Sequence, residues 1–255
     1  MIAFYAELKL NLKRRMTDGF ALGYNVVFPI IMILLLGTLC KGVYKGEISS
    51  FQYYAIVVIP FSTLMGIVTA AYAGKDDAYA KVAQRVMVSP ITKEAIVMSK
   101  VISCTIVFSI CSSLVFGIMA IVAHVPVGTS LLSIMALLVS ISFFISSLGT
   151  VVGLGMKNFF TVKNIMTIPI CLFAILGGTF FPMGSLQSKM QLLINLSPLT
   201  WINKSLFLAM YDHNKVLICW ITLILLLAGT GCIFTAMIIF QKEEYLYGDL
   251  PGYEK

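Results

Sequence analysis

The chain has 255 residues, of which 59% are hydrophobic and only 11% are charged. Soluble domains have about 45–50% apolar and about 25% charged residues, so this excess cannot be buried in one water-soluble core. The composition excludes a soluble globular protein and indicates one polytopic membrane domain over residues 1–255. The net charge of +7 does not indicate a nucleic-acid partner, because the basic residues lie where membrane topology places them.

Residues 1–19 are rich in charge and lack the apolar core of a cleavable signal peptide, so we expect the first membrane span to be retained. Phe4, Leu8, Leu12 and Met16 recur at four-residue spacing. This pattern favours an interfacial helix that lies along the inner membrane surface. The alternative is a positively charged leader that only sets the topology, and the two interpretations are compatible.

Six apolar segments are long enough to cross a bilayer core of roughly 30 Å, which takes about 20 residues of helix. They cover residues 20–40, 51–73, 98–123, 130–156, 163–181 and 216–240. Because backbone polar groups in lipid must bond to one another, we expect an all-α membrane protein with six transmembrane helices. Thirteen of the 18 Lys and Arg residues then lie on the inner side, which predicts cytoplasmic N- and C-termini.

The longest inner connection, residues 74–97, has mixed charge. A short helix is expected from Asp77 to Met87, ended by Ser89-Pro90, and Thr92 would cap the helix that follows. A short helix between two spans suits contact with a cytoplasmic partner. The alternative is a plain solvated loop.

Two spans carry small residues at the spacing that allows helices to approach closely in lipid. Gly149 and Gly153 lie in the fourth span, and Ala228, Gly229 and Gly231 lie in the sixth. The spacing predicts close packing but does not identify the packing partner.

The stretch from Gly177 to Trp201 interrupts the apolar pattern between the fifth and sixth spans. Gly177 and Gly178 lower the cost of a bend or a close approach. Pro182 removes a backbone donor and favours a helix break. A short amphipathic run follows, so this segment resembles neither a full span nor a solvated loop.

Catalytic signatures are missing from the sequence. It contains no HExxH, no GxSxG and no GxxxxGK[ST] motif, and the six cysteines form no CxxC pair. No charged residue lies in the middle of an expected span, which argues against an ion-coupled pump. We therefore expect no catalytic residue, metal or cofactor on this chain, which either works passively or is driven by another polypeptide.

The order and spacing of these features resemble the membrane subunit of type-2 ATP-binding-cassette exporters, the ABC-2 permeases. The resemblance covers essentially the whole chain. Its motifs are Ser89-Pro90 with Glu94 and Lys100, then Phe181-Pro182, Leu186 and the ending Asn195-Leu196-Ser197-Pro198-Leu199-Thr200. Ser197 intervenes between Asn195 and Pro198, which is a small departure from the family pattern.

The resemblance implies that two permease subunits, either two copies of this chain or this chain and a homologue, enclose a central path. Two separate ATPase subunits would bind ATP and Mg and push on the inner loop. The ATPase contact would consist of Lys81, Gln84, Arg85, Ser89 and Pro90.

In such exporters the segment between spans five and six is a re-entrant hairpin, here residues 182–205, that covers the outer end of the path. The lid residues would be Phe181, Pro182, Leu186, Asn195 and Pro198. The alternative is an outer loop without a gating role. Candidates for the path itself are Asn25, Phe28, Thr63, Thr69, Thr167, Phe173, Thr179 and Phe180, although aromatic residues in spans more often pack or face lipid.

The expected function is ATP-driven export by a non-enzymatic subunit in the plasma membrane of a prokaryote. A path without buried charge suits an amphipathic drug, an antimicrobial peptide or a lipid-like molecule. Alternatives are a polysaccharide or sodium exporter of the same family, or a passive transporter or channel that needs no ATPase.

Overall fold

The computed structural model describes residues 2–41, 48–89, 91–156, 159–180, 194–240 and 245–246. These residues form helices and short connections, and no strand occurs among them. The helices are α1 (Ile2–Thr17), α2 (Gly19–Leu22), a π-helical turn (Gly23–Val27), α3 (Phe28–Leu39), α4 (Ser50–Met65), α5 (Ile67–Tyr79), α6 (Ala83–Val88), α7 (Lys93–Val122), a 3-10 turn (Gly128–Ser130), α8 (Leu131–Gly155), α9 (Phe159–Leu176), α11 (Pro198–Met210) and α12 (Val216–Ile239).

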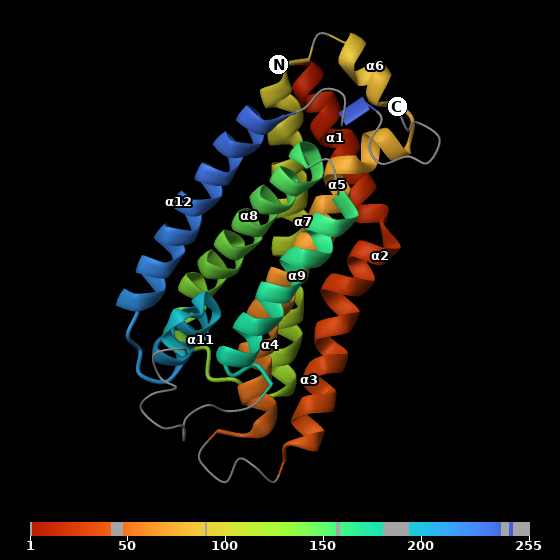
Figure 1. Ribbon diagram of the computed structural model, residues 1–255. Coiled ribbons are helices and arrows are strands. Elements are labelled where there is room, and N and C mark those ends of the chain that lie inside the picture. The colour runs from red at the N-terminus through yellow and green to blue at the C-terminus, as the bar shows by residue number, and fades with distance from the viewer. Residues whose placement is uncertain are drawn as a thin grey trace.

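The long helices run side by side in one elongated bundle (Figure 1). The start of α1 and the short helix α6 lie at one end of this bundle, called the α6 end below. The short helix α11 and the end of α3 lie at the opposite end, called the α11 end. The expected ATPase-contact residues around α6 and the expected lid residue Pro198 of α11 therefore lie at opposite ends of the bundle.

Five helical stretches are long and apolar enough to cross a membrane. They are Gly19–Leu39, Ser50–Tyr79, Lys93–Val122, Gly128–Gly155 and Val216–Ile239, and they match five of the six expected spans. The remaining expected span, 163–181, corresponds to α9, whose apolar part Asn164–Leu176 is shorter. Thirteen helical residues cover about 20 Å of a core of about 30 Å, so the sixth span stays a prediction.

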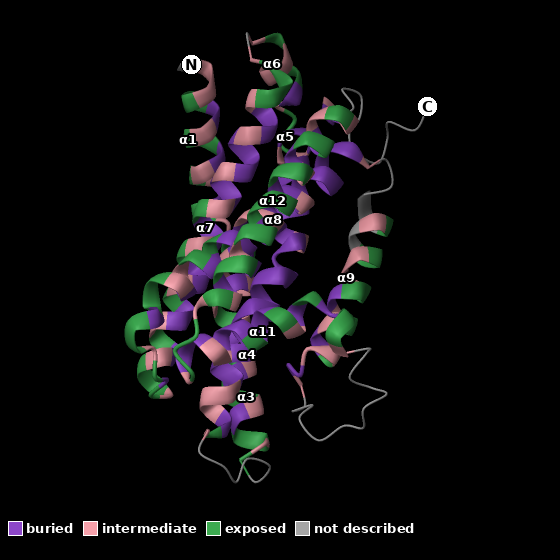
Figure 2. Ribbon diagram, turned by 90° about the vertical axis from the view of Figure 1, so that its left-hand side faces the viewer, coloured by how far each residue is buried: buried purple, intermediate pink, exposed green. Residues whose placement is uncertain are grey.

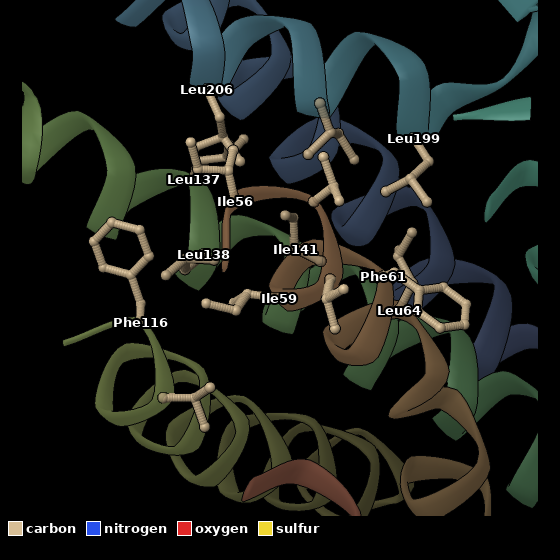
Figure 3. Close-up of a cluster of buried hydrophobic side chains, with 14 of the residues drawn as sticks. Ile56, Ile59, Phe61, Leu64, Phe116, Leu137, Leu138, Ile141, Leu199 and Leu206 are labelled. Carbon is tan, nitrogen blue, oxygen red and sulfur yellow. The ribbon is translucent and has the colours of Figure 1, made fainter. Parts of the chain in front are cut away.

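Helix α4 forms the centre of the bundle because it is apolar on every side. Every residue from Tyr54 to Met65 is buried. Figure 3 shows Ile56 and Ile59 of α4 near Leu138 and Ile141 of α8. From α11, Leu206 lies near Ile56, and Leu199 lies toward Phe61 and Leu64 of α4. Figure 2 shows that buried residues follow the central helices, whereas the peripheral helix α9 is mostly exposed or intermediate.

The small residues of the fourth span pack against α5. A Cβ atom added to Gly149 would lie 2.4 Å from the Cβ of Ala70, and one added to Gly74 would lie 2.6 Å from the Cα of Gly153. Both distances are shorter than a non-bonded carbon contact allows. The predicted close packing is therefore confirmed, and its partner, which the spacing could not identify, is the second span.

The inner connection differs from the sequence prediction at its start. Helix α5 continues to Tyr79, a turn follows, and the short helix α6 begins only at Ala83. The prediction of a short helix from Asp77 is therefore wrong, because ion pairs to distant helices hold Asp77 within α5. The predicted cap is confirmed, since Thr92 Oγ1 accepts a hydrogen bond from the backbone N–H of Ala95 at 3.3 Å.

Candidate coupling site at the α6 end

Helix α6 presents a polar and an apolar side. Its turn includes Lys81, whose φ of 55° is unusual for a non-glycine residue. Lys81, Gln84 and Arg85 are exposed, whereas Ala83 is buried in a small apolar cluster with Ile96 of α7. The structure thus brings three of the expected ATPase-contact residues together, with Gln84 and Arg85 on α6 and Lys81 in the turn before it.

The remaining two expected contact residues follow α6. Ser89 is half-buried, and its hydroxyl donates a hydrogen bond to the carbonyl oxygen of Val86 at 2.5 Å. Pro90 lies outside the described residues. Val88 is 88% exposed, so an unshielded apolar side chain lies beside the cationic ones. A surface of this composition suits contact with another protein.

A buried carboxylate lies directly beneath this connection. Asp77, near the end of α5, is fully buried and is bound by two cations and a hydroxyl. Arg14 Nη1 of α1 lies 2.6 Å from its Oδ1, Lys100 Nζ of α7 lies 2.7 Å from its Oδ2, and the Tyr245 hydroxyl donates to Oδ2 at 2.9 Å. One side chain therefore joins three helices and the short Tyr245 segment.

A second set of ion pairs extends the same network, which we call the Asp77 cluster (Glu7, Asn11, Arg14, Arg15, Asp18, Asp76, Asp77, Ser99, Lys100 and Tyr245). Arg15 is buried and pairs with Asp76 of α5, and it also lies 3.1 Å from Asp18. Lys100 Nζ donates a further hydrogen bond to the Ala73 carbonyl oxygen at 2.9 Å. Buried charges with this many partners are held in one geometry, since an unpaired one would be costly.

Helix α1 turns one polar stripe inward, while Lys9 and Lys13 stay exposed. Glu7, Asn11 and Arg15 recur every four residues and are all buried, whereas Met16 is 55% exposed. Asn11 Nδ2 donates to Glu7 Oε1 and to Ser99 Oγ of α7, both at 3.1 Å. The polar stripe of α1 thus packs on α7, and the placement of this helix on a membrane surface stays a prediction.

The surroundings of the Asp77 cluster favour the protonated forms of Glu7 and Tyr245, which both lie outside the spans. Burial raises the pKa of the Glu7 carboxyl, and the nearby Asp77 carboxylate raises it further. Burial and the same carboxylate also raise the pKa of the Tyr245 hydroxyl above its ordinary value. Tyr245 therefore acts as a hydrogen-bond donor to Asp77. Within the described ranges, no group of three His, Cys, Asp or Glu residues lies together as a metal site would require.

The α11 end holds the interrupted segment that follows α9. Gly178 has a φ of 74°, which glycine adopts without strain. The Tyr53 hydroxyl of α4 donates to the Gly178 carbonyl oxygen at 2.8 Å, and Tyr54 donates to that of Phe180 at 3.1 Å. Asn203 Nδ2 of α11 donates to the Gly177 carbonyl oxygen at 2.9 Å. Side chains from two helices therefore satisfy the backbone where α9 stops.

Two expected lid residues lie beside this break. Pro198 is the first residue of α11, as proline's missing N–H allows, and the carbonyl oxygen of Asn195 accepts a hydrogen bond from Trp201 Nε1 at 2.8 Å. Phe181, Pro182 and Leu186 lie outside the described residues. The lid itself stays a prediction.

The expected path residues do not form one group. Thr179 is buried and its hydroxyl has no partner among the described residues, while Phe180 packs edge-on against Phe61 at 5.7 Å between ring centroids. Asn25 lies instead in the first span, where its Nδ2 donates to the carbonyl oxygen of Ala21 in the same span at 2.7 Å. Thr63 donates within its own helix.

Further path candidates lie on three different helices, α3, α5 and α9. Phe28 stacks on Tyr24 at 5.5 Å, Thr69 lies 3.5 Å from Asn25 Nδ2, and the carbonyl oxygen of Phe173 accepts from Ser197. Thr167 lies on α9. These positions leave the course of a path as a prediction.

The model of the ABC-2 type transporter family matches residues 2–211, which include the Asp77 cluster apart from Tyr245, all of α6, and the break before α11. This chain belongs to the ABC-2 type transporter family. Among curated proteins, none matches it. Membership, together with the five long apolar helices, makes the chain an integral membrane subunit of ATP-binding-cassette transport.

Sequence reasoning missed the most heavily bonded part of this ABC-2 subunit. It treated Arg14 and Arg15 as topology signals, Asp76 as part of the inner connection and Asp77 as the start of the short helix expected there. One signal was available, because Lys100 lies inside the expected third span, 98–123, and a lysine there needs a partner. The adjacent acidic pair Asp76-Asp77 follows the second span, and pairing across the two spans could have been predicted.

Proposed function

We propose that this chain is the translocation subunit of an ATP-driven exporter, moved by separate ATPase subunits that contact α6. The observation that carries the proposal is the fully buried Asp77, which joins α5 to Arg14 of α1 and Lys100 of α7 six residues before α6 begins. A force applied at α6 would therefore reach three helices together.

The exposed side of α6 is the proposed ATPase contact. Lys81, Gln84 and Arg85 supply charge and hydrogen-bonding groups, and Val88 supplies apolar area. A partner with an acidic rim and an apolar notch would fit this surface, because complementary charge fixes the register of an interface. Two ATPase subunits, each with ATP and Mg, would close and push on the helix.

Transmission along the bundle would use the close packing of α5 on α8. The contacts between Gly149 and Ala70 and between Gly74 and Gly153 leave no room for the two helices to slide independently. Packed elements of this kind move as units. Movement at the α6 end would thus reach the break near Gly178, where Tyr53 and Asn203 hold the backbone.

The outer-end lid and the cargo complete the proposal. Residues 182–205 would cover the path between two permease subunits, with both chain ends in the cytoplasm of a prokaryotic cell. An amphipathic drug, an antimicrobial peptide or a lipid-like molecule fits a bundle whose spans carry no charge at their centres. Export of a polysaccharide or of sodium, and passive transport, are the competing outcomes of the test.

The test separates hydrolysis from transport. We expect the double substitution Lys81→Glu and Arg85→Glu to leave ATP hydrolysis by the partner measurable but to lower the transport rate at least tenfold. A tenfold change corresponds to about 1.4 kcal/mol in the free energy that couples hydrolysis to transport. Co-reconstituted vesicles would report both rates. Lys41→Glu, a charge reversal at the α11 end, serves as the matched control and should retain transport.

Two results would contradict the proposal. One is unchanged transport in the Lys81→Glu/Arg85→Glu protein. The other is transport by the chain alone, in pure lipid and without ATP, which would support a passive transporter or an ion-driven one. If the variant instead fails to insert, Lys81→Gln and Arg85→Gln give a milder change with the same expected direction.

A further inference from the structure

A groove lies between α11 and α12 at the α11 end, and it has a volume of about 420 Å³. Its floor consists of Ile202, Ile221 and Leu225, all buried. Its walls are Trp201, Trp220 and Ile224, which are 40%, 60% and 59% exposed. The groove is thus open along one side and almost wholly apolar, and its volume falls in the range of about 300–1,000 Å³ that is usual for ligand pockets.

The length of the groove matches one half of a bilayer. On α12 it runs from Leu217 to Leu225, eight residues further along a helix that rises 1.5 Å per residue, or about 12 Å. Half of a hydrocarbon core of about 30 Å is about 15 Å. An acyl chain of the adjoining leaflet could therefore lie in the groove over most of its depth.

A positive charge lies beside one wall of the groove. The exposed Lys204 has its Nζ 5.5 Å from the centroid of the Trp201 ring, a cation–π distance. None of the residues that line the groove is acidic. Tryptophan and lysine together are typical of the membrane–water interface, where indoles lie at headgroup level and lysine binds anionic lipid.

We propose that the α11–α12 groove binds the acyl chain of an anionic phospholipid, whose phosphate is bound by Lys204. This lipid site does not rest on the proposed ATP-driven transport, and it is a separate place in the molecule from the Asp77 cluster. A second copy of the chain and a free phosphate are the other occupants that the experiment must distinguish.

Fluorescence provides a direct test because the chain has two tryptophans, and both line the groove. The full chain is reconstituted in phosphatidylcholine vesicles that contain a minor fraction of acyl-brominated phosphatidylglycerol or acyl-brominated phosphatidylcholine. We expect the anionic lipid to quench the tryptophans at about fivefold lower mole fraction, which is the contribution of one lysine near an anionic lipid surface.

Variants tie this preference to the groove. Lys204→Gln should abolish the fivefold preference, and Lys204→Arg should keep it. Lys41→Gln is the matched control, because Lys41 Nζ lies 5.8 Å from the ring centroid of Phe51 at the same end, and Phe51, unlike Trp201, does not line the groove. Its preference should equal that of the unmodified chain.

Three results would overturn the lipid site. Equal quenching by the two brominated lipids would show that the headgroup is not recognised. Absence of quenching by either lipid would show that protein covers the groove, as in a dimer through this face. Loss of the preference in excess inorganic phosphate would show that Lys204 binds free phosphate rather than a lipid.

Discussion

At the scale of single residues, the buried carboxylate of Asp77 joins α5 to α1 and α7. Its carboxylate lies 2.6 Å and 2.7 Å from the nitrogens of Arg14 and Lys100 and accepts the Tyr245 hydroxyl. Because Asp77 is fully buried, water cannot replace a partner that is lost. Removing one member of such a group leaves the others as uncompensated buried charges.

We expect Asp77→Asn to lower the free energy of unfolding by about 3–5 kcal/mol, because Lys100 and Arg14 lose their buried counter-charge. Thermal unfolding in detergent would measure the change. Asp212→Asn, at an exposed position, is the control and should change stability by less than about 0.5 kcal/mol. The double variant Asp77→Asn/Lys100→Met should lose less than the sum of the two single changes; simple additivity would argue against the ion pair.

Glu7 makes the stability of the same end depend on pH. Its folded-state pKa is raised by burial and by Asp77, so the folded protein binds this proton more tightly than the unfolded chain does. The stability contribution of the proton is complete below the unfolded pKa and is lost as pH rises through the folded pKa. Glu7→Gln should remove this loss while keeping the amide–oxygen contact with Asn11.

We therefore expect Glu7→Gln to melt higher than the unmodified chain at pH 8 by about 2–4 °C, the shift that about 1 kcal/mol produces in a chain of this size. At pH 4 the two should melt together. Melting curves across this pH range provide the measurement. The exposed Glu94, changed to Gln, should show no gain, and a higher melting temperature for the unmodified chain at pH 8 would contradict the argument.

At the scale of helices, the contact of α5 with α8 depends on the absence of side chains. Gly149 and Gly153 lie so close to Ala70, Ala71 and Gly74 that an added methyl group would overlap backbone or Cβ atoms. Dispersion contacts over such a surface replace the hydrophobic effect, which does not drive helices together in lipid. The second and fourth spans are thereby fixed relative to each other.

Alanine substitutions at two glycines should have opposite effects. Gly149→Ala is expected to destabilise the protein by about 1–3 kcal/mol through overpacking. Gly231→Ala, in α12 with nothing within 4 Å of its added Cβ, should stabilise by about 0.5–1 kcal/mol through helix propensity. Unfolding measured for both variants in one detergent would test the pair. Equal effects of the two substitutions would refute the close contact.

At the scale of the whole molecule, the two ends of the bundle differ in chemistry. The α6 end concentrates buried ion pairs among α1, α5 and α7, whereas at the α11 end neutral hydrogen bonds hold the break beside Gly178. Buried charges need several partners and resist rearrangement. A neutral hydrogen bond contributes only about 0.5–1.5 kcal/mol to stability, so it is more easily exchanged. This contrast supports the proposal that the α6 end receives force and the α11 end rearranges more easily, and the Lys81→Glu/Arg85→Glu substitution tests that proposal.

The sequence by itself determined the features that depend on local chemistry. Five spans follow from apolar length, and the cap at Thr92 follows from its hydroxyl. Gly177 and Gly178 predicted a bend or close approach, but the helix break was expected at Pro182, whereas α9 ends earlier, at Leu176. Only the tertiary structure decided that Asp77 belongs to α5, that α1 turns Glu7 and Asn11 inward, and which helix meets Gly149. These depend on groups from 23 residues apart, as for Asp77 and Lys100, to 88 residues apart, as for Asn11 and Ser99, and hydropathy and spacing describe only neighbours along the chain.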